Sequence, residues 1–127
     1  MKAGLITGAS SGIGLELAKI HASKGENVLL VARRKEKLLV LAEEIEAKFK
    51  VQALVFECDL GDENAVEELI ESIASKGIFV NFLFNNAGFG GWGTFADRNA
   101  HEDRNMVAVN IQALIRLTHA FLPEMVK

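Results

Sequence analysis

The sequence predicts an α/β protein built on a doubly wound parallel sheet, and three observations lead to that fold class. Short apolar runs alternate with longer stretches of helical period, in the order βαβαβαβα. The second apolar run, residues 28–32, contains no polar residue, which is typical of a strand buried on both faces. A glycine-rich segment, residues 7–14, directly follows the first run. Right-handed crossovers then predict the spatial strand order 3-2-1-4.

Each element in that order has a local signal. Continuous apolar residues predict strands over residues 3–7, 28–32, 52–57 and 80–84. Apolar residues spaced three and four apart predict helices over residues 13–23, 35–48 and 101–126. A further helix is expected to begin at a cap formed by Asp62 or Gly61 and to stop at Gly77. A glycine-rich loop fills residues 88–100.

Two of these helices have features that can be checked. Ile13, Leu17 and Ile20 form the apolar side of the first helix. The last helix is expected to break or fray near Pro123, because proline lacks the N–H that a helix interior needs.

The fourth strand occupies an edge in the predicted order. Its residues Phe82, Leu83 and Phe84 are apolar, and natural folds normally cover such an edge. We therefore expect the domain to be incomplete as it stands. Another copy of the chain, in a homo-oligomer, or a C-terminal half of the protein is expected to cover strand four.

Composition excludes several classes of function. The chain has 127 residues, 50% of them hydrophobic and 24% charged, which is the profile of one globular domain over residues 1–127. A net charge of −3 provides no basic field for a phosphate backbone, so no nucleic-acid partner is expected. No apolar run approaches the length of a membrane span and the start does not resemble a signal peptide. We expect no membrane partner and a cytoplasmic location.

Metal and thiol chemistry also lack support. The single Cys58 cannot form an internal disulfide and is expected to be a small buried side chain. His21, His101 and His119 lie on separate elements or turns, so no metal site is expected.

The strongest functional signal is the glycine-rich segment between the first strand and the first helix. Gly8, Gly12 and Gly14 have the spacing GxxxGxG, with Ser10, Ser11 and Ile13 between them. Glycines let the backbone turn tightly and approach a pyrophosphate, which then lies at the helix N-terminus. No lysine follows, which argues against a phosphate-transfer loop. The alternative is a purely structural role, in which these glycines serve only a tight turn.

The chain resembles the N-terminal half of the short-chain dehydrogenase/reductase family over essentially all 127 residues. Four signatures occur in the family's order: the glycine segment, Cys58-Asp59-Leu60, Asn85-Asn86-Ala87-Gly88, and Asn110. The resemblance implies a Rossmann-like fold, a nicotinamide dinucleotide cofactor, and hydride transfer to a carbonyl or from an alcohol.

The end of the second strand predicts which dinucleotide is preferred. A site selective for NAD places an acidic residue there, to accept the ribose hydroxyls. This chain instead has Ala32, Arg33 and Arg34, and two guanidinium groups suit a 2′-phosphate. We predict NADP(H) over NAD(H), with Arg33 as the first candidate and Arg34 as the second. Two solvated arginines at a helix start are the alternative.

The resemblance assigns further cofactor contacts. In the family, the aspartate that matches Asp59, next to Leu60, accepts a hydrogen bond from the adenine amino group. Asp59 could instead only cap the following turn. Asn86, Ala87 and Gly88 line the cofactor's ribose by resemblance, at the crevice beside strand one where open α/β sheets bind ligands. For Asn85, a purely structural role and a binding role are equally expected.

Asn110 and an aromatic loop are the remaining candidates. Asn110 lies in an apolar helix and needs hydrogen-bond partners there. The family uses the matching asparagine to shape the helix and to hold a water in a proton relay, so catalytic and structural roles both stay open. Phe89, Trp92 and Phe95 form an aromatic loop at the mouth of the crevice, and they are expected either to contact substrate or the nicotinamide region or to cover a neighbouring subunit or a missing segment.

The family's acid–base machinery is absent from this sequence. Family members use a tyrosine as general acid or base, with a lysine four residues later and a serine that positions substrate. This chain has no tyrosine. We favour the interpretation that the chain is the cofactor-binding half of an NADP(H)-dependent oxidoreductase, because every cofactor feature is intact. Since the catalytic serine, tyrosine and lysine are missing, we expect this half to be inactive alone. The alternatives are a non-catalytic nucleotide-binding or interaction module, or a half-enzyme complemented by another chain.

Overall fold

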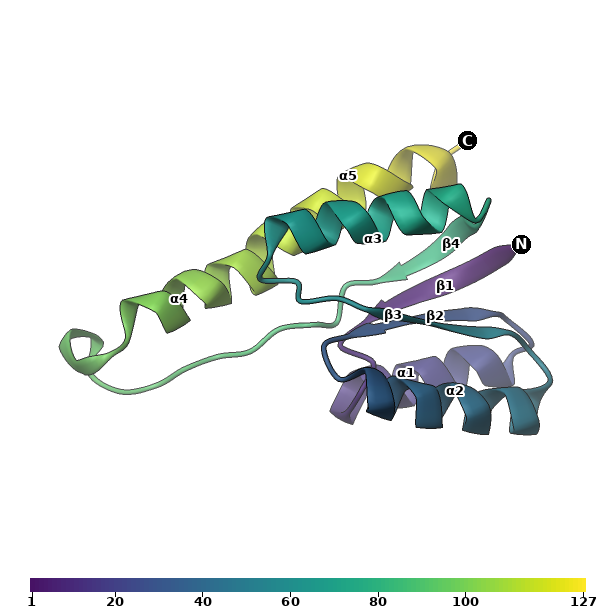
Figure 1. Ribbon diagram of the computed structural model, residues 1–127, viewed down its shortest axis with the longest axis horizontal. Helices are drawn as coiled ribbons and strands as arrows, with labels where there is room; N and C mark the ends of the chain where they lie inside the picture. Colours follow the sequence, from purple (N-terminus) through teal and green to yellow (C-terminus); the bar gives the residue numbers. More distant parts are fainter.

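Four parallel strands form one sheet in the spatial order β3-β2-β1-β4 in the computed structural model, which describes residues 1–127 (Figure 1). Every neighbouring pair of strands is parallel. The strands are β1 (Lys2–Thr7), β2 (Val28–Ala32), β3 (Ala53–Glu57) and β4 (Phe79–Phe84). The predicted fold class and strand order are confirmed, and no observed strand end differs from its predicted position by more than one residue.

Helices cover both faces of the sheet. The helices are α1 (Gly12–Ser23), α2 (Lys35–Phe49), α3 (Glu63–Ser75), α4 (Ala100–Val107) and α5 (Leu114–Met125). Figure 1 shows α1 and α2 on one face of the sheet and α3 and α5 on the other, with α4 extending past the sheet. Asp62 caps α3, because its Oδ1 accepts hydrogen bonds from Asn64 N at 2.9 Å and Ala65 N at 3.4 Å. Of the two predicted caps, the structure therefore selects Asp62.

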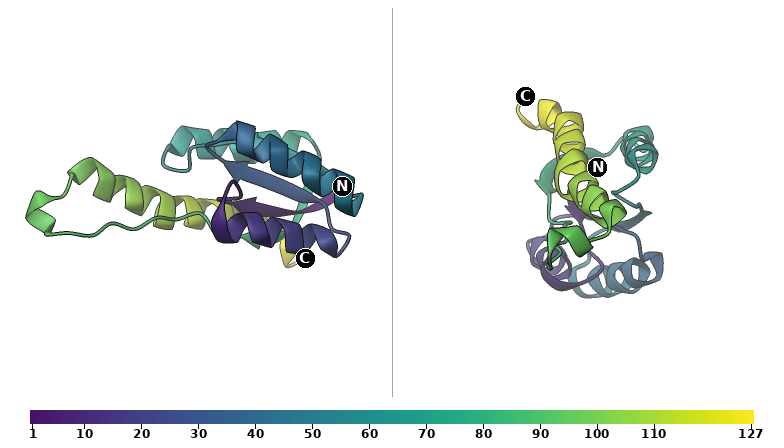
Figure 2. Two further views of the ribbon diagram at one scale, coloured as in Figure 1. Left: turned by 90° about the horizontal axis from the view of Figure 1, so that it is seen from below. Right: turned by 90° about the vertical axis from the view of Figure 1, so that its left-hand side faces the viewer.

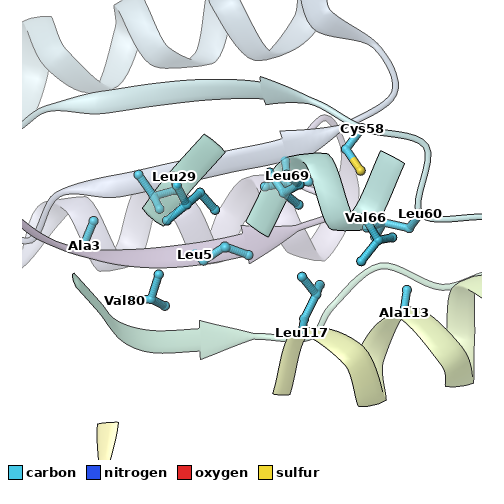
Figure 3. Packing of buried hydrophobic residues seen from close by; sticks show 12 residues of the cluster. Ala3, Leu5, Leu29, Cys58, Leu60, Val66, Leu69, Val80, Ala113 and Leu117 are labelled. Carbon is cyan, nitrogen blue, oxygen red and sulfur yellow. The ribbon is translucent and has the colours of Figure 1, made fainter. Parts of the chain in front are cut away.

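Alternation along the strands creates two hydrophobic cores. Leu5 of β1 faces the layer of α3 and α5, whereas Ile6 faces the layer of α1 and α2. Figure 3 shows the first core, in which Leu5 and Leu29 lie beside Leu117 and Leu69. Because β2 contributes side chains to both cores, all five of its residues are buried, as its composition predicted.

The first helix packs through small residues, which differs from the prediction. Its buried side is formed by Gly14, Ala18, His21 and Ala22. Ile13 is 74% exposed and Ile20 is 54% exposed, so these two predicted residues lie off the buried side, whereas Leu17 is partly buried and packs against the core. Small side chains let the helix backbone lie close to the sheet, and that packing decides which side is covered.

The last helix does not break at Pro123, and the expectation of a break there is wrong. Helical structure continues through Pro123 to Met125. Because proline has no N–H, one backbone hydrogen bond of the helix is missing at Pro123. The helix ends only two residues later, so little of it remains to be disrupted. The irregularity lies earlier, in a π-helical segment over Ala108–Ala113 between α4 and α5.

The same helix corrects a second expectation. Ala100–Met125 forms one run of 26 residues whose length and composition would also allow a membrane crossing. The statement that no run approaches that length is therefore wrong. A mostly buried core helix of a soluble protein meets the same criteria, but only 11% of the apolar stretch is buried here, and the helix contacts the sheet through Ala113 and Leu117. The absence of a membrane partner stays a prediction.

Two parts of the fold are left uncovered. β4 lies at an edge of the sheet, as predicted, and its Phe82 is 47% exposed. The second is an arm formed by the loop after β4, the short helix η1 (Phe95–Asp97) and α4. Figure 2 shows this arm projecting from the body of the molecule.

Candidate functional site

A cleft of about 400 Å³ opens where the strands of the sheet end, and we call it the main cleft. It brings together segments that follow β1, β2, β3 and β4. Most of the predicted binding residues line it: Gly8, Ser10, Ser11, Ile13, Arg33, Arg34, Asp59, Leu60, Asn86, Ala87 and Gly88. The predicted residues Gly12 and Gly14 do not line it, since Gly12 lies over a neighbouring hollow and Gly14 is buried.

The glycine segment has the geometry of an anion site. Gly8 and Gly12 have φ angles of +67° and +57°, which glycine adopts without strain. A Cβ at Gly14 would lie 2.2 Å from Gly8 O, so this position requires glycine for close packing. Ser11 stands at the N-cap of α1, but its side chain accepts no hydrogen bond from the first turn. The helix N-terminus therefore has no side-chain cap, which suits a bound phosphate.

The two arginines after β2 differ in their contacts. Arg34 donates from Nη2 to Ser10 Oγ at 3.2 Å and to Ser11 Oγ at 3.3 Å. Arg33 makes no hydrogen bond or ion pair within the chain, although it lines both the main cleft and the hollow beside it. The guanidinium of Arg33 is thus the one with all its donors free for a ligand.

Asp59 takes part in a turn and also faces the main cleft. Its Oδ1 accepts a hydrogen bond from Gly61 N at 2.9 Å, and its carbonyl oxygen accepts one from Asp62 N at 3.0 Å. The second carboxylate oxygen has no partner within the chain. Asp59 therefore combines the turn-capping role with a free acceptor at the cleft. Burial raises the pKa of the neighbouring Cys58 thiol to about 11, with Asp59 adding to the shift, so Cys58 is not a reactive thiolate.

The end of β4 is joined to the end of β1 by a hydrogen-bond network around Thr7. Thr7, which is buried, accepts hydrogen bonds at Oγ1 from Asn86 N at 3.0 Å and from Ala87 N at 2.9 Å. Asn86 Nδ2 donates to Thr7 O at 3.0 Å. The Asn86 side chain thus joins two segments that line the main cleft, one after β1 and one after β4. Asn85 donates to Thr118 Oγ1 at 3.1 Å and does not line the cleft, which favours its structural role.

Asn110 lies beneath the loop that closes this end of the cleft. Its Oδ1 accepts a hydrogen bond from Phe89 N at 3.0 Å, and its Nδ2 donates to Phe89 O at 2.7 Å. Asn110 does not line the main cleft, although Gly88 and Phe89 do. The structure shows the structural part of its predicted role, and the proton relay stays a prediction.

Sequence reasoning missed four lining residues, and the predicted aromatic loop lies in two places. The missed residues are Ala32, Cys58, Asn105 and Val109. Phe89, a candidate from the aromatic loop, lines the main cleft, whereas Asn105 has no sequence signal beyond its helical spacing of four from Val109. Trp92 and Phe95 lie on the arm and are 93% and 82% exposed.

A family profile described as short chain dehydrogenase matches residues 2–127 of the chain. The protein belongs to the short-chain dehydrogenase family. Among curated relatives of this short-chain dehydrogenase, the very-long-chain 3-oxoacyl-CoA reductase of Meyerozyma guilliermondii is 40% identical over 126 residues, covering 96% of this chain and 36% of the relative. The fatty acyl-CoA reductase of Acinetobacter baylyi is 42% identical over 136 aligned positions, covering 99% of this chain and 43% of the relative.

Solved structures agree with this assignment. A short-chain dehydrogenase from Sphingobium yanoikuyae in complex with NADPH superimposes with a TM-score of 0.91 at 32% identity, covering 99% of this chain and 49% of that one. The chain spans about a third to a half of the length of the curated relatives it matches. The matched part therefore corresponds to the N-terminal half of these short-chain dehydrogenases.

Proposed function

We propose that this chain is the cofactor-binding half of an NADP(H)-dependent oxidoreductase that interconverts carbonyls and alcohols. The observation that most supports the choice of cofactor is the unpartnered guanidinium of Arg33 at the main cleft. No acidic residue stands at the end of β2, where a site selective for NAD would hold one. When bound, the nicotinamide dinucleotide supplies or accepts the hydride at nicotinamide C4.

The residues of the main cleft fit the parts of such a cofactor. The uncapped start of α1 and the glycine segment accommodate a diphosphate. Asp59 offers a free carboxylate oxygen to an adenine amino group. Arg33 binds a 2′-phosphate, and Arg34 stabilises the phosphate loop through its hydrogen bonds to Ser10 and Ser11.

The test is nucleotide affinity in an Arg33→Asp variant, measured by calorimetry with NADPH and NADH. We expect NADPH to bind roughly 10- to 100-fold more weakly, because a hydrogen bond to a charged group is worth about 1.5–3 kcal/mol. NADH affinity is expected to stay unchanged. Lys76→Asp, at the exposed C-cap of α3, makes the same charge change away from the cleft and serves as control. Unchanged NADPH affinity in Arg33→Asp would refute the assigned contact.

A second candidate rests on the absence of tyrosine from these 127 residues. A phenol supplies the family's proton transfer, so the chain alone would be a nucleotide-binding module, or a half-enzyme that another chain completes. We expect the 127-residue chain to bind NADPH without oxidising it in the presence of carbonyl compounds. Steady NADPH consumption with any aldehyde or ketone would contradict this expectation, and copurification of a second chain would favour complementation.

A further inference from the structure

Asn105 is a polar residue at the main cleft for which neither the sequence nor the family likeness gave a role. It lies in α4 and is half-buried. It lines the main cleft, and it also lines the adjoining hollow of about 470 Å³ together with Arg33. Val109, four residues later on the same helix face, lines the main cleft as well. The Asn105 side chain makes no hydrogen bond within the chain, so its amide is free for a ligand.

The Asn105 amide lies close to the turn that holds Asp59. A Cβ built on Gly61 would stand 2.0 Å from Asn105 Oδ1 and 3.2 Å from Asp59 Oδ1. The absence of a side chain at Gly61 therefore lets an amide from α4 approach the turn that carries the Asp59 carboxylate. Gly61 N donates to Asp59 Oδ1 at 2.9 Å, which holds the carboxylate there.

The two side chains together have the hydrogen-bonding pattern of an adenine site. The 6-amino group of adenine has two N–H donors, and the ring nitrogens beside it are acceptors. A carboxylate only accepts, whereas an amide accepts at oxygen and donates at nitrogen. An asparagine amide can bind the amino group and N7 of adenine at once, by accepting from the first and donating to the second. Asp59 supplies the acceptor for the second amino hydrogen.

We propose that Asn105 selects adenine at this site, by pairing with the amino group and N7 while Asp59 binds the same amino group. This inference rests on the proposed dinucleotide function. Hypoxanthine carries an oxygen in place of the amino group, so it presents two acceptors, O6 and N7, to the Asn105 amide and sets an oxygen against the Asp59 carboxylate. The protein should therefore bind adenine dinucleotides more tightly than their hypoxanthine counterparts.

The test compares the dissociation constants of NADPH and of the hypoxanthine analogue of NADPH, measured by calorimetry. The wild-type protein is expected to prefer NADPH. In Asn105→Ala this preference should fall roughly tenfold, because a bidentate pair is lost. The fold should survive, since Asn105 has no partner within the chain, and the melting temperature verifies that. Gly61→Ala, whose Cβ would displace the amide oxygen, should reproduce the loss of preference.

Two controls distinguish the proposed role of Asn105 from the proposed dinucleotide function. Gln112→Ala removes an exposed amide of the π-helical segment after α4, outside the main cleft, and should leave the preference for NADPH intact. Arg33→Ala should weaken both ligands equally and keep the preference, because the 2′-phosphate is common to both. An unchanged preference in Asn105→Ala overturns the role of Asn105 alone. Failure of the wild-type protein to bind either dinucleotide overturns the proposed function and this inference together.

Discussion

The side-chain amide of Asn110 pairs with both backbone groups of Phe89, 21 residues earlier in the chain. Phe89 N donates to Oδ1 at 3.0 Å, and Nδ2 donates to Phe89 O at 2.7 Å. This pair joins the loop after β4 to the π-helical segment over Ala108–Ala113. A residue that does not line the main cleft thus holds one of its walls, since Phe89 does line it.

Replacing Asn110 tests that connection. Asn110→Ala leaves the N–H and carbonyl of Phe89 without these partners, and we expect the free energy of unfolding to fall by about 1–3 kcal/mol. Urea titration followed by circular dichroism measures the change. Gln112→Ala, an exposed amide in the same segment, is the control and should alter the stability by less than about 0.5 kcal/mol. Equal stability of the two variants would show that the pair with Phe89 contributes nothing.

Gly14 is expected to be the least replaceable glycine of the glycine segment. In Gly14→Ala the new Cβ would lie 2.2 Å from Gly8 O and 2.4 Å from Asn86 Nδ2, so the loop must shift. We expect a loss of stability of about 1–3 kcal/mol or more, with loss of NADPH binding. Gly90→Ala, where nothing lies within 4 Å of the added Cβ, is the matched control. Thermal melts and calorimetry of both variants decide the matter, and a fully stable Gly14→Ala that still binds NADPH would contradict the packing described.

The burial of His21 leads us to expect that the stability of the protein depends on pH. Burial lowers the pKa of His21 below its ordinary value of 6.5, an effect that Glu26 opposes and Lys24 reinforces. The ring lies next to Gly4 and makes T-shaped contacts with Phe82 and Phe84, and its Nε2 has no hydrogen-bond partner. Between the lowered pKa and 6.5 the unfolded chain binds more protons than the folded chain. The His21 contribution to stability is therefore complete above 6.5 and is lost as the pH falls through the folded-state pKa.

Urea midpoints across this pH range measure the effect. His21→Leu should remove the part of the acid destabilisation that belongs to this ring, so its stability should fall less steeply between about pH 7 and about pH 5 than that of the wild type. His119→Leu, which replaces an exposed ring, is the control. Identical slopes for wild type and His21→Leu would exclude a role for the buried ring.

Self-association is expected from the uncovered surfaces. Val107, Ile111, Ile115 and Leu122 lie along the last helix and are 45–50% exposed, and the edge strand β4 is also open. Apolar surface of this extent on one helix typically marks an interface. We expect sedimentation velocity to detect species larger than a monomer, and Ile111→Lys together with Ile115→Lys to reduce them if the helix forms the contact. A monomer at every concentration would rule out this expectation.

Local chemistry was sufficient to predict the sheet and most of the main cleft. The uninterrupted apolar residues of β2 require a strand covered on both faces, and the positive φ angles of Gly8 and Gly12 match a turn that the glycine spacing already indicated. Arg33 directly follows β2 and Asp59 is the second residue after β3, so parallel topology alone brings them to one end of the sheet.

Other features depended on contacts between residues far apart in sequence. Helical spacing grouped Ile13 with Ile20, but the close packing of Gly14, Ala18 and Ala22 against the sheet decided which side of α1 is buried. The π-helical segment could not be located from the sequence, because it coincides with the pairing of Asn110 and Phe89 across a loop. Asn105 reaches the cleft only because a glycine at position 61 leaves space for its amide. Sequence periodicity and glycine spacing determined the elements and their order, since both arise from local backbone geometry. The fit between packed surfaces determined which side chains face the cleft.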